Sequence, residues 1–301
     1  MALTEQMRSD SPATDVAVYL QALFFRQTES LYFIPVSLIV PGSQIPFVKG
    51  GDRDKATLDI VGQVKDAQGI SVGNVQQTVK LAVDAAAEVQ RKNIQYSTGF
   101  TLAPGRYHLK FVVRESQTGN MGSFETDIQV PDLKKAPLKM SSVVVASQRT
   151  PNTEKHAASP LVRDGLEWVP NVAHVFRQNQ HLYFLYEVYD PGKSKDVKGE
   201  AVTTPASKDR SPGTPIKLLT SIQFMNNGTK VYETPLVTAV AVNDPEHGAV
   251  VFQFDVPLAQ LKPGTYICQV NVIDDAGGSF MFPRLALKVT AAGVATAPGS
   301  K

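Results

Sequence analysis

The side chains that could act as nucleophiles or metal ligands are few and scattered in this 301-residue sequence. Cys268 is the only cysteine, and one thiol can form neither an internal disulfide nor a cysteine-based zinc site. Five histidines stand in different segments: His108, His156, His174, His181 and His247. Only His174 and His181 lie near each other, on either side of an expected turn. The pattern predicts no metal and no cofactor, and Cys268, inside an apolar run, is expected to be a buried, inert thiol.

Neighbouring carboxylates occur at two places but lack the surroundings that chemistry requires. Asp274 and Asp275 precede Ala-Gly-Gly, and Asp52 and Asp54 follow Gly-Gly. Calcium needs several more oxygen ligands, so both pairs are expected to be solvated turns. The sequence contains no His-Glu-x-x-His, phosphate-loop or dinucleotide motif. It also contains no Gly-x-Ser-x-Gly nucleophile elbow, because the one match to that pattern, Gly69–Gly73, follows an expected hairpin turn and leads into a strand instead of a helix. We therefore expect a protein that is not an enzyme.

Charge and composition argue against a nucleic-acid-binding protein and against a membrane-spanning protein. The chain carries 30 basic and 28 acidic residues, a net charge of +2, which offers no general attraction for nucleic acid. Hydrophobic residues make up 43%, enough for packed cores, yet no apolar run reaches the roughly 18 residues of a membrane span. The first residues carry acids and no apolar core, so no secretory signal peptide is expected within the sequence.

The secondary-structure signal is dominated by short strands. Runs of β-branched and aromatic residues bounded by Gly, Pro, Asn or Asp predict seven strands in the first half: 16–25, 31–40, 56–65, 75–83, 93–102, 106–114 and 122–130. One short helix is expected at 84–91, with Asp84 as its cap. Eight strands are predicted in the second half: 141–146, 172–176, 181–190, 216–225, 229–235, 250–256, 265–274 and 279–289.

The two halves repeat one plan. Leu102–Tyr107 and Leu261–Tyr266 share the pattern Leu-x-Pro-Gly-x-Tyr at an offset of 159 residues, and a hairpin signal ending at Gly69 recurs at the same offset, ending at Gly228. Leu31-Tyr32-Phe33 matches Leu182-Tyr183-Phe184 at 151. We infer a tandem duplication and predict an all-β fold of two immunoglobulin- or fibronectin-III-like β-sandwiches.

The repeated motif has a structural explanation. In Pro104-Gly105 and Pro263-Gly264 we expect a type II turn, in which proline fixes φ and glycine takes a positive φ. Tyr107 and Tyr266 follow as the first inward residues of their strands, and each hydroxyl is expected to bond to nearby backbone, as in a tyrosine corner.

These features predict the domain boundaries. We expect a flexible N-terminal segment at 1–14, a first sandwich at 15–133, a second at 134–290, and a flexible tail at 291–301. The second sandwich carries two long polar insertions, Gln148–Glu167 and Pro191–Pro215. Loops of that length are usually functional or mobile. Deleting either insertion is therefore expected to leave the thermal midpoint nearly unchanged.

Aromatic residues supply the candidate binding surface. Trp168 is the only tryptophan, and Tyr183, Tyr186 and Tyr189 crowd one predicted strand. Apolar residues on both faces of that strand suggest one face on the core and one against a neighbour. Edge strands and the two insertions are further contact surfaces for a protein partner. The alternative is a carbohydrate-binding module that uses these aromatic rings.

Short segments spread along the chain resemble the C-terminal region of the acidobacterial-type von Willebrand factor A-related domain proteins. The segments that carry the resemblance are Met7–Asp15, Ala22–Phe25, Phe33–Leu38, Val40–Gly42, Leu102–Tyr107, Val112–Arg114, Thr118–Ser123, Val130–Leu133, Val169–Pro170, Val175–Phe176 and Glu187–Asp190.

The resemblance implies an accessory region rather than a metal-binding domain. In that family a preceding A domain binds a divalent ion through Asp-x-Ser-x-Ser, and this sequence lacks the motif; its nearest approach, Asp209–Gly213, lacks the last serine. What remains implied is a non-catalytic module that spaces or contacts a protein partner, such as an A domain encoded upstream. Family members generally look exported, which implies a periplasmic or secreted location.

Overall fold

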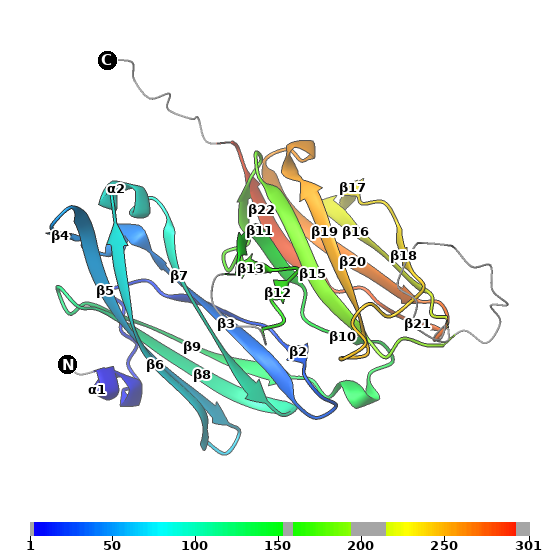
Figure 1. Ribbon diagram of the computed structural model, residues 1–301, viewed down its shortest axis with the longest axis horizontal. Coiled ribbons are helices and arrows are strands. Elements are labelled where there is room, and N and C mark those ends of the chain that lie inside the picture. The colour runs from blue at the N-terminus through cyan, green and yellow to red at the C-terminus, as the bar shows by residue number, and fades with distance from the viewer. Residues whose placement is uncertain (1–2, 153–158, 194–214, 293–301) are drawn as a thin grey trace, which may run out of the picture. The chain divides into compact units, whose positions relative to one another are not determined.

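The computed structural model describes residues 3–152, 159–193 and 215–292 (Figure 1). The chain divides into two compact units, Met1–Asp132 and Leu133–Lys301. Strands dominate both units, and their sheets stack as β-sandwiches, which confirms the all-β prediction. The helices of the described residues are too short to cross a bilayer.

The first unit contains nine strands, two short α-helices and a 3-10 turn. Its elements are α1 (Leu3–Arg8), β1 (Tyr19–Ala22), β2 (Phe25–Arg26), β3 (Tyr32–Pro41), η1 (Gly42–Gln44), β4 (Val48–Gly50), β5 (Arg53–Asp66), β6 (Ser71–Val83), α2 (Ala86–Val89), β7 (Asn93–Leu102), β8 (Gly105–Glu115) and β9 (Met121–Val130). Helix α2 does not use Asp84 as expected: Asp54 accepts the hydrogen bond from the Ala86 N–H at 2.9 Å.

Two antiparallel sheets form this unit. Strand β3 pairs with β1, β2 and β7, while β5 pairs with β4, β6 and β8, and β8 pairs with β9. Alternate residues of β7 and β8 point between the sheets. The rings of Phe100 and Phe111 meet there edge to face, with centroids 6.4 Å apart.

The N-terminal residues lie against the strands of the first unit instead of hanging loosely as expected. The Lys110 ammonium, on β8, donates to the Ser9 carbonyl at 2.6 Å. Thr14 forms a β-bridge with Gly122, and the Ser123 N–H donates to the Ala13 carbonyl at 2.9 Å. The prediction of a flexible 1–14 segment is therefore wrong for residues 3–14, whose partners lie more than a hundred residues along the chain.

The second unit is also built from two sheets. Its elements are η2 (Leu133–Lys135), β10 (Lys139–Met140), β11 (Val144–Pro151), β12 (Val162–Arg163), β13 (Leu166–Pro170), β14 (Val175–Arg177), β15 (His181–Tyr189), β16 (Leu218–Asn226), β17 (Thr229–Glu233), β18 (Val237–Ala239), β19 (Ala249–Pro257), η3 (Leu258–Gln260), β20 (Gly264–Asp274), β21 (Ser279–Met281) and β22 (Arg284–Thr290).

One sheet of this unit has the order β10-β15-β11-β13-β12 with β19 on β15, and the other has β14-β22-β20-β16-β17 with β18 on β16 and β21 on β20. Strand β14 runs parallel to β22, and the other pairings are antiparallel. Phe184 and Phe224 join the two sheets through an edge-to-face contact at 6.1 Å.

The 159-residue offset corresponds to a shared register. Gly105 pairs with Val130 and Tyr107 with Ile128; in the second unit Gly264 pairs with Val289 and Tyr266 with Leu287. Each strand ends in a buried carboxylate at the same offset: Glu115 accepts from the N–H groups of Gln117 and Thr118, and Asp274 from those of Gly277 and Gly192.

The match at 151 is a sequence coincidence. Tyr32 lies in the core of the first unit at 0% exposure, whereas Tyr183 lies on the face of β15 opposite the core residue Phe184. A slip of one residue moves a side chain to the other face of a strand, so the equivalent positions cannot be 151 apart.

Of the two features predicted for the repeated motif, the tyrosine hydrogen bond is present and the type II turn is not. The Tyr107 hydroxyl donates to the Ala103 carbonyl at 2.9 Å and the Tyr266 hydroxyl to the Lys262 carbonyl at 2.6 Å, which confirms the tyrosine-corner bond in both copies. The type II turn is wrong, because neither Gly105 nor Gly264 is among the described glycines with positive φ. Both glycines instead begin a strand and pair in its ladder.

The insertion Gln148–Glu167 contains strands where a loop is expected. Arg149 pairs with Trp168, Val162 pairs with Glu167, and Leu161 is buried at 4% exposure. Deleting it would remove all of β12 and parts of β11 and β13, so the structure leads us to expect a fall in the thermal midpoint instead of little change. The insertion Pro191–Pro215 lies almost wholly outside the described residues.

Candidate functional site

The most distinctive surface of the second unit is the outer side of the sheet that contains β16, β20 and β22. Along β20 the side chains alternate: Tyr266, Cys268, Val270 and Val272 point into the core, and the intervening residues point outward. We call this outward surface the unit 2 outer face, defined by Leu219, Ser221, Gln223, Glu233, Gln269, Asn271, Ile273, Phe280, Phe282 and Arg284.

Apolar side chains form one end of this face. Cross-strand pairing places Leu219 beside Ile273 and Ile273 beside Phe280. The Phe280 ring stacks on Phe282 with centroids 5.3 Å apart and an interplanar angle of 25°. Phe280 is 64% exposed, Phe282 43% and Ile273 38%, so this row lies open to solvent. Large aromatic rings held open in this way are typical of contact surfaces.

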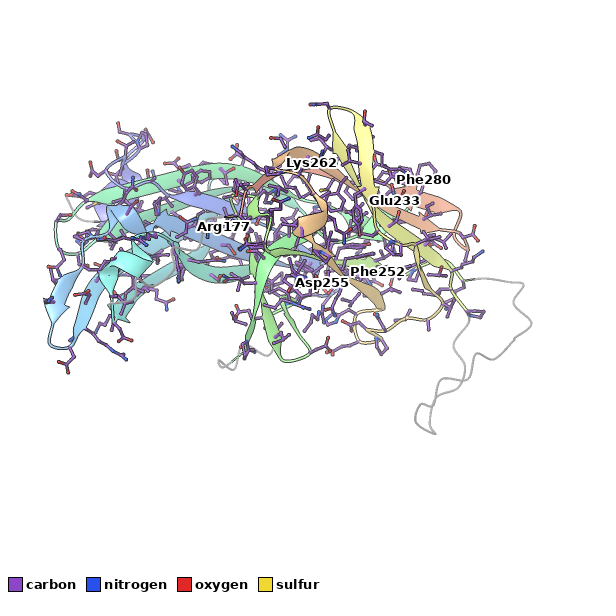
Figure 2. The ribbon with its side chains drawn as sticks, turned by 90° about the horizontal axis from the view of Figure 1, so that it is seen from above. Arg177, Glu233, Phe252, Asp255, Lys262 and Phe280 are labelled. Atoms are coloured by element: carbon purple, nitrogen blue, oxygen red, sulfur yellow. The ribbon has the colours of Figure 1, made fainter. Side chains whose placement is uncertain are left out.

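A polar band lies beside the apolar row, with Glu233 at one end. The Glu233 carboxylate receives hydrogen bonds from Lys230 at 2.7 Å, Ser221 at 2.9 Å and Gln223 at 3.2 Å. These donors, Lys230 first, lower the pKa of Glu233 below its usual range. The carboxylate is therefore ionised and fixed in position at neutral pH. Figure 2 labels Glu233 and Phe280, which mark the polar and the aromatic parts of the face.

The other end of the band is a chain of amides. The Arg284 Nε donates to the Gln269 amide oxygen at 2.7 Å, and the Gln269 amide nitrogen donates to Asn271 at 2.8 Å. Asn271 in turn donates to the Ser221 hydroxyl at 3.0 Å. Each amide is oriented by its neighbour, so a ligand that binds here meets donors and acceptors already in place.

The corresponding face of the first unit is charged. Arg114 binds Asp59 at 2.7 Å, Lys110 binds Glu125 at 2.6 Å, and His108 lies 2.8 Å from Asp127. The hydrogen bond from Arg114, followed by that from Thr78, lowers the pKa of Asp59.

Residues 3–16 cover part of this charged face of the first unit. A polar cavity of about 450 Å³ remains between helix α1 and the face, lined by Thr4, Met7, Arg8, Asp10, Gln63, Lys65, His108, Lys110 and Glu125. Of the two faces, that of the second unit is the more open and the more apolar.

The prediction that four aromatic residues form a binding surface is wrong for three of them, which are buried. Trp168 is 1% exposed, Tyr186 0% and Tyr189 1%. Their polar atoms have internal partners: the Tyr186 hydroxyl lies 2.5 Å from Thr220 Oγ1, and the Tyr189 hydroxyl donates to Glu187 at 2.7 Å. The aromatics crowd β15 because both of its faces are buried.

Tyr183 is partly exposed, but its ring already has neighbours. The Arg149 guanidinium lies 4.0 Å from the ring centroid, and the His181 ring is nearly parallel to it at 6.0 Å. His181 is held in turn by Asp255, 2.5 Å away. Tyr183 therefore offers no clear face on which a flat ligand could stack.

A charged cluster fixes the end of the first insertion. Arg163, on β12, contacts both Glu187 and Asp244, and His247 lies 3.1 Å from Asp244. Burial raises the pKa of Glu187, against the opposing effect of Arg163. The terminal nitrogens of Arg163 bind the two carboxylates, so the cluster ties β12 to β15, while the buried Arg163 Nε has no hydrogen-bond partner.

The remaining predicted residues have structural positions. Cys268 is fully buried, as expected, and burial raises the pKa of its thiol. Asp274 is buried rather than solvated, while Asp275 binds Lys217 at 2.7 Å. Among the described residues no group of three or more His, Cys, Asp or Glu side chains could hold a metal ion.

Sequence reasoning missed Phe280 and Phe282. Both alternate with Met281 at the period of a strand, which places them on one side, and that signal is present in the sequence. The sequence does not tell which side of the sheet these rings face, because the same alternation fits a strand that turns either side to the core.

Comparison with known proteins adds the following. No protein-family model matches the chain, and no curated protein matches it. Among solved structures, a Bacteroides uniformis β-glucuronidase is similar over 37% of this chain and 13% of its own, at 10% identity and a TM-score of 0.26. A putative β-galactosidase from Bacteroides fragilis matches over 38% of this chain and 16% of its own, at 14% identity and a TM-score of 0.26. A structural-genomics target matches over 41% of this chain and 92% of its own, at 15% identity and a TM-score of 0.26.

Proposed function

We propose that the chain is a non-catalytic binding module that contacts another protein through the unit 2 outer face. The observation that carries the proposal is the row formed by half-buried Leu219 and by Ile273 and Phe280, which are open to solvent and bordered by fixed polar groups. Protein interfaces commonly place aromatic anchors at their centre and polar groups at the rim. The first unit is then a spacer whose corresponding face is partly occupied by its own N-terminal residues.

The resemblance of the sequence to von Willebrand factor A-related proteins suggests the partner. An A domain encoded upstream, in the same or a neighbouring reading frame, is the protein that this module is proposed to contact. Such proteins generally look exported, so a periplasmic or secreted location belongs to the same proposal.

Calorimetric titration of the chain with the A domain of a family member tests this function. We expect saturable binding, weakened at least tenfold by Phe280→Ala, since loss of a central aromatic anchor costs about 2 kcal/mol. Ile70→Ala is the matched control, because Ile70 is 62% exposed on a hairpin of the other unit. Equal affinities for both variants and the unaltered chain would remove the outer face from the proposal, and absence of binding would remove the A domain.

A carbohydrate ligand is the second candidate, favoured by the polar band. Amides, a carboxylate and a guanidinium offer both donors and acceptors to sugar hydroxyls, and the adjacent phenylalanine rings offer an apolar surface. A glycan array separates the candidates: binding lost on Gln269→Ala as well as Phe280→Ala would support the carbohydrate. Trp168→Ala is not informative, because Trp168 is buried.

The non-catalytic part of the proposal is supported by the state of the reactive groups. Burial keeps the Cys268 thiol protonated at neutral pH. His108, His181 and His247 each face a carboxylate, and His174 faces the Ala286 carbonyl at 3.0 Å.

A further inference from the structure

Strand β6 of the first unit is a long edge strand with one side unpaired. Residues 54–65 of β5 pair with β6, and among the described residues no strand pairs with its other side. Along the 13 residues from Ser71 to Val83, the backbone donors and acceptors of alternate residues therefore point away from β5 to the surroundings. Such edges are templates for the addition of another strand.

The usual protections of an edge are sparse on β6. The strand contains no proline, and Lys80 is its only charged residue. The other edge of the same sheet, on β9, is bonded to residues 13–16. In the second unit the corresponding strand is short: β17 ends at Glu233, and Pro235 separates it from β18.

We propose that β6 pairs with β6 of a second copy of this chain, antiparallel, about a two-fold axis at Gln77. Gln77 is the midpoint of the strand, so this register uses every residue from 71 to 83. The inference is independent of the unit 2 outer face and of any ligand bound there.

The side chains of β6 are self-complementary in this register. On the core side Val75 comes opposite Val79 of the second copy, and Gly73 opposite Leu81; these are partly exposed residues at the open margin of the core. On the outer side Gln76 meets Thr78, and Lys80 meets Asn74. Apolar residues thus face apolar residues, and the one charged residue avoids its own copy, as a symmetric pairing requires.

Cysteine cross-linking of the full chain tests the register. Gln77→Cys is expected to form a disulfide-linked dimer on mild oxidation, because the two introduced thiols face each other across the axis. Thr78→Cys is the matched control: its opposite residue is Gln76, so it is expected to remain largely uncross-linked. Mixing Gln76→Cys with Thr78→Cys should restore the cross-link. Cys268 does not interfere, because it is fully buried.

Analytical ultracentrifugation tests the association itself. Wild type is expected to be a dimer. Gln77→Lys should raise the dimer Kd on the order of fivefold (about 1 kcal/mol), because like charges then lie opposite each other. Gln77→Glu should behave likewise, and an equimolar mixture of the two should associate again. Tyr96→Phe, which removes the hydrogen bond of Tyr96 to Gln77 at 3.1 Å, should leave the dimer intact.

Three outcomes would overturn the proposal: a wild-type chain that stays monomeric up to its solubility limit, a dimer insensitive to charge at position 77, or equal cross-linking of Gln77→Cys and Thr78→Cys. A monomer that binds an extended peptide at β6 would show that the occupant of the edge is another protein. Circular dichroism of each variant confirms that the fold is retained.

Discussion

The outer faces of the two units lie on equivalent strands, β5 and β8 in the first unit and β16 and β20 in the second, and share a register, yet their side chains differ in chemistry. The ion pair of Asp59 and Arg114 in the first unit occupies the cross-strand position that Leu219 and Ile273 hold in the second. Residues 3–16 cover part of the first face, and the second is open. The inward residues and the tyrosine corner determine the register, so the outward residues are free to diverge toward a different role.

The cores of the two units differ in another way: where one core residue is smaller than its counterpart in the other unit, its cross-strand neighbour is larger. Gly62 lies opposite Phe111 in the first unit, and Ile222 lies opposite Val270 at the corresponding place in the second. A Cβ at Gly62 would lie 2.3 Å from the Phe111 ring, so glycine is required there by close approach. One large residue and one small residue fill the space that two residues of middle size fill in the other unit.

The largest expected change in the free energy of unfolding comes from placing the residue types of Ile222 and Val270 at positions 62 and 111 of the first unit. Gly62→Ile should lower the free energy of unfolding by about 3 kcal/mol through overpacking. Phe111→Val alone should cost about 2 kcal/mol by leaving a cavity. The double variant should recover to within about 1 kcal/mol of wild type, since each change removes the fault of the other. Urea unfolding followed by circular dichroism measures all four proteins.

Simple additivity of the two costs would contradict the equivalence of these core positions. The reciprocal exchange, Ile222→Gly with Val270→Phe in the second unit, is the matched control and should show coupling of the same sign.

Removing the hydroxyl groups of the two tyrosine corners should change the free energy of unfolding by a smaller amount. Tyr107→Phe and Tyr266→Phe each remove a hydroxyl bond to a carbonyl four residues earlier, which should cost about 1 kcal/mol. The loss at Tyr266 should be the larger, because Tyr266 is 4% exposed and its hydrogen bond is partly buried, whereas that of Tyr107 is exposed. Trp168 fluorescence follows unfolding of the second unit, and circular dichroism follows both. A smaller loss at Tyr266 than at Tyr107 would show that burial does not set the strength of this bond.

The ion pair of the first unit gives the smallest effect, and a pH dependence of definite sign. The folded-state pKa of Asp59 is lowered, so its contribution is present above the unfolded pKa, about 3.9, and is lost as pH falls through the folded value. Asp59→Asn should cost less than about 1 kcal/mol near neutral pH, and the difference from wild type should shrink on acidification. Asp52→Asn is an exposed control. A difference that grows as pH falls would mean that Asp59 is not stabilised by Arg114.

Local signals in the sequence were sufficient for most strands and for some turns. Strand β7 matches its predicted bounds of 93–102, and the Asn-Gly hairpin has positive φ at both Asn227 and Gly228. The side that a strand presents was harder to predict, since alternation fits both directions. Tyr32 and Tyr183 therefore looked equivalent although they face opposite ways.

Contacts between distant residues explain the larger errors. Trp168 looked like part of a binding surface because it is the only tryptophan and adjoins a long polar insertion, but β13 pairs with β11 and Trp168 is buried. Residues 3–14 looked free because Lys110 and Gly122, which hold them, lie far along the chain. The open face around Phe280 could not be recognised without knowing which sheet carried it.

The attachment of Ser9 to Lys110 and of Ala13 to Ser123 has a consequence for synthesis of the protein. Once synthesised, Ser9 and Ala13 must wait for partners made more than a hundred residues later. The second unit also joins distant parts of its chain, because β14 pairs with β22, the last of its described strands. Each unit can therefore close only after nearly all of its own chain has emerged, and β6, already released by then, is exposed to neighbouring chains throughout that interval.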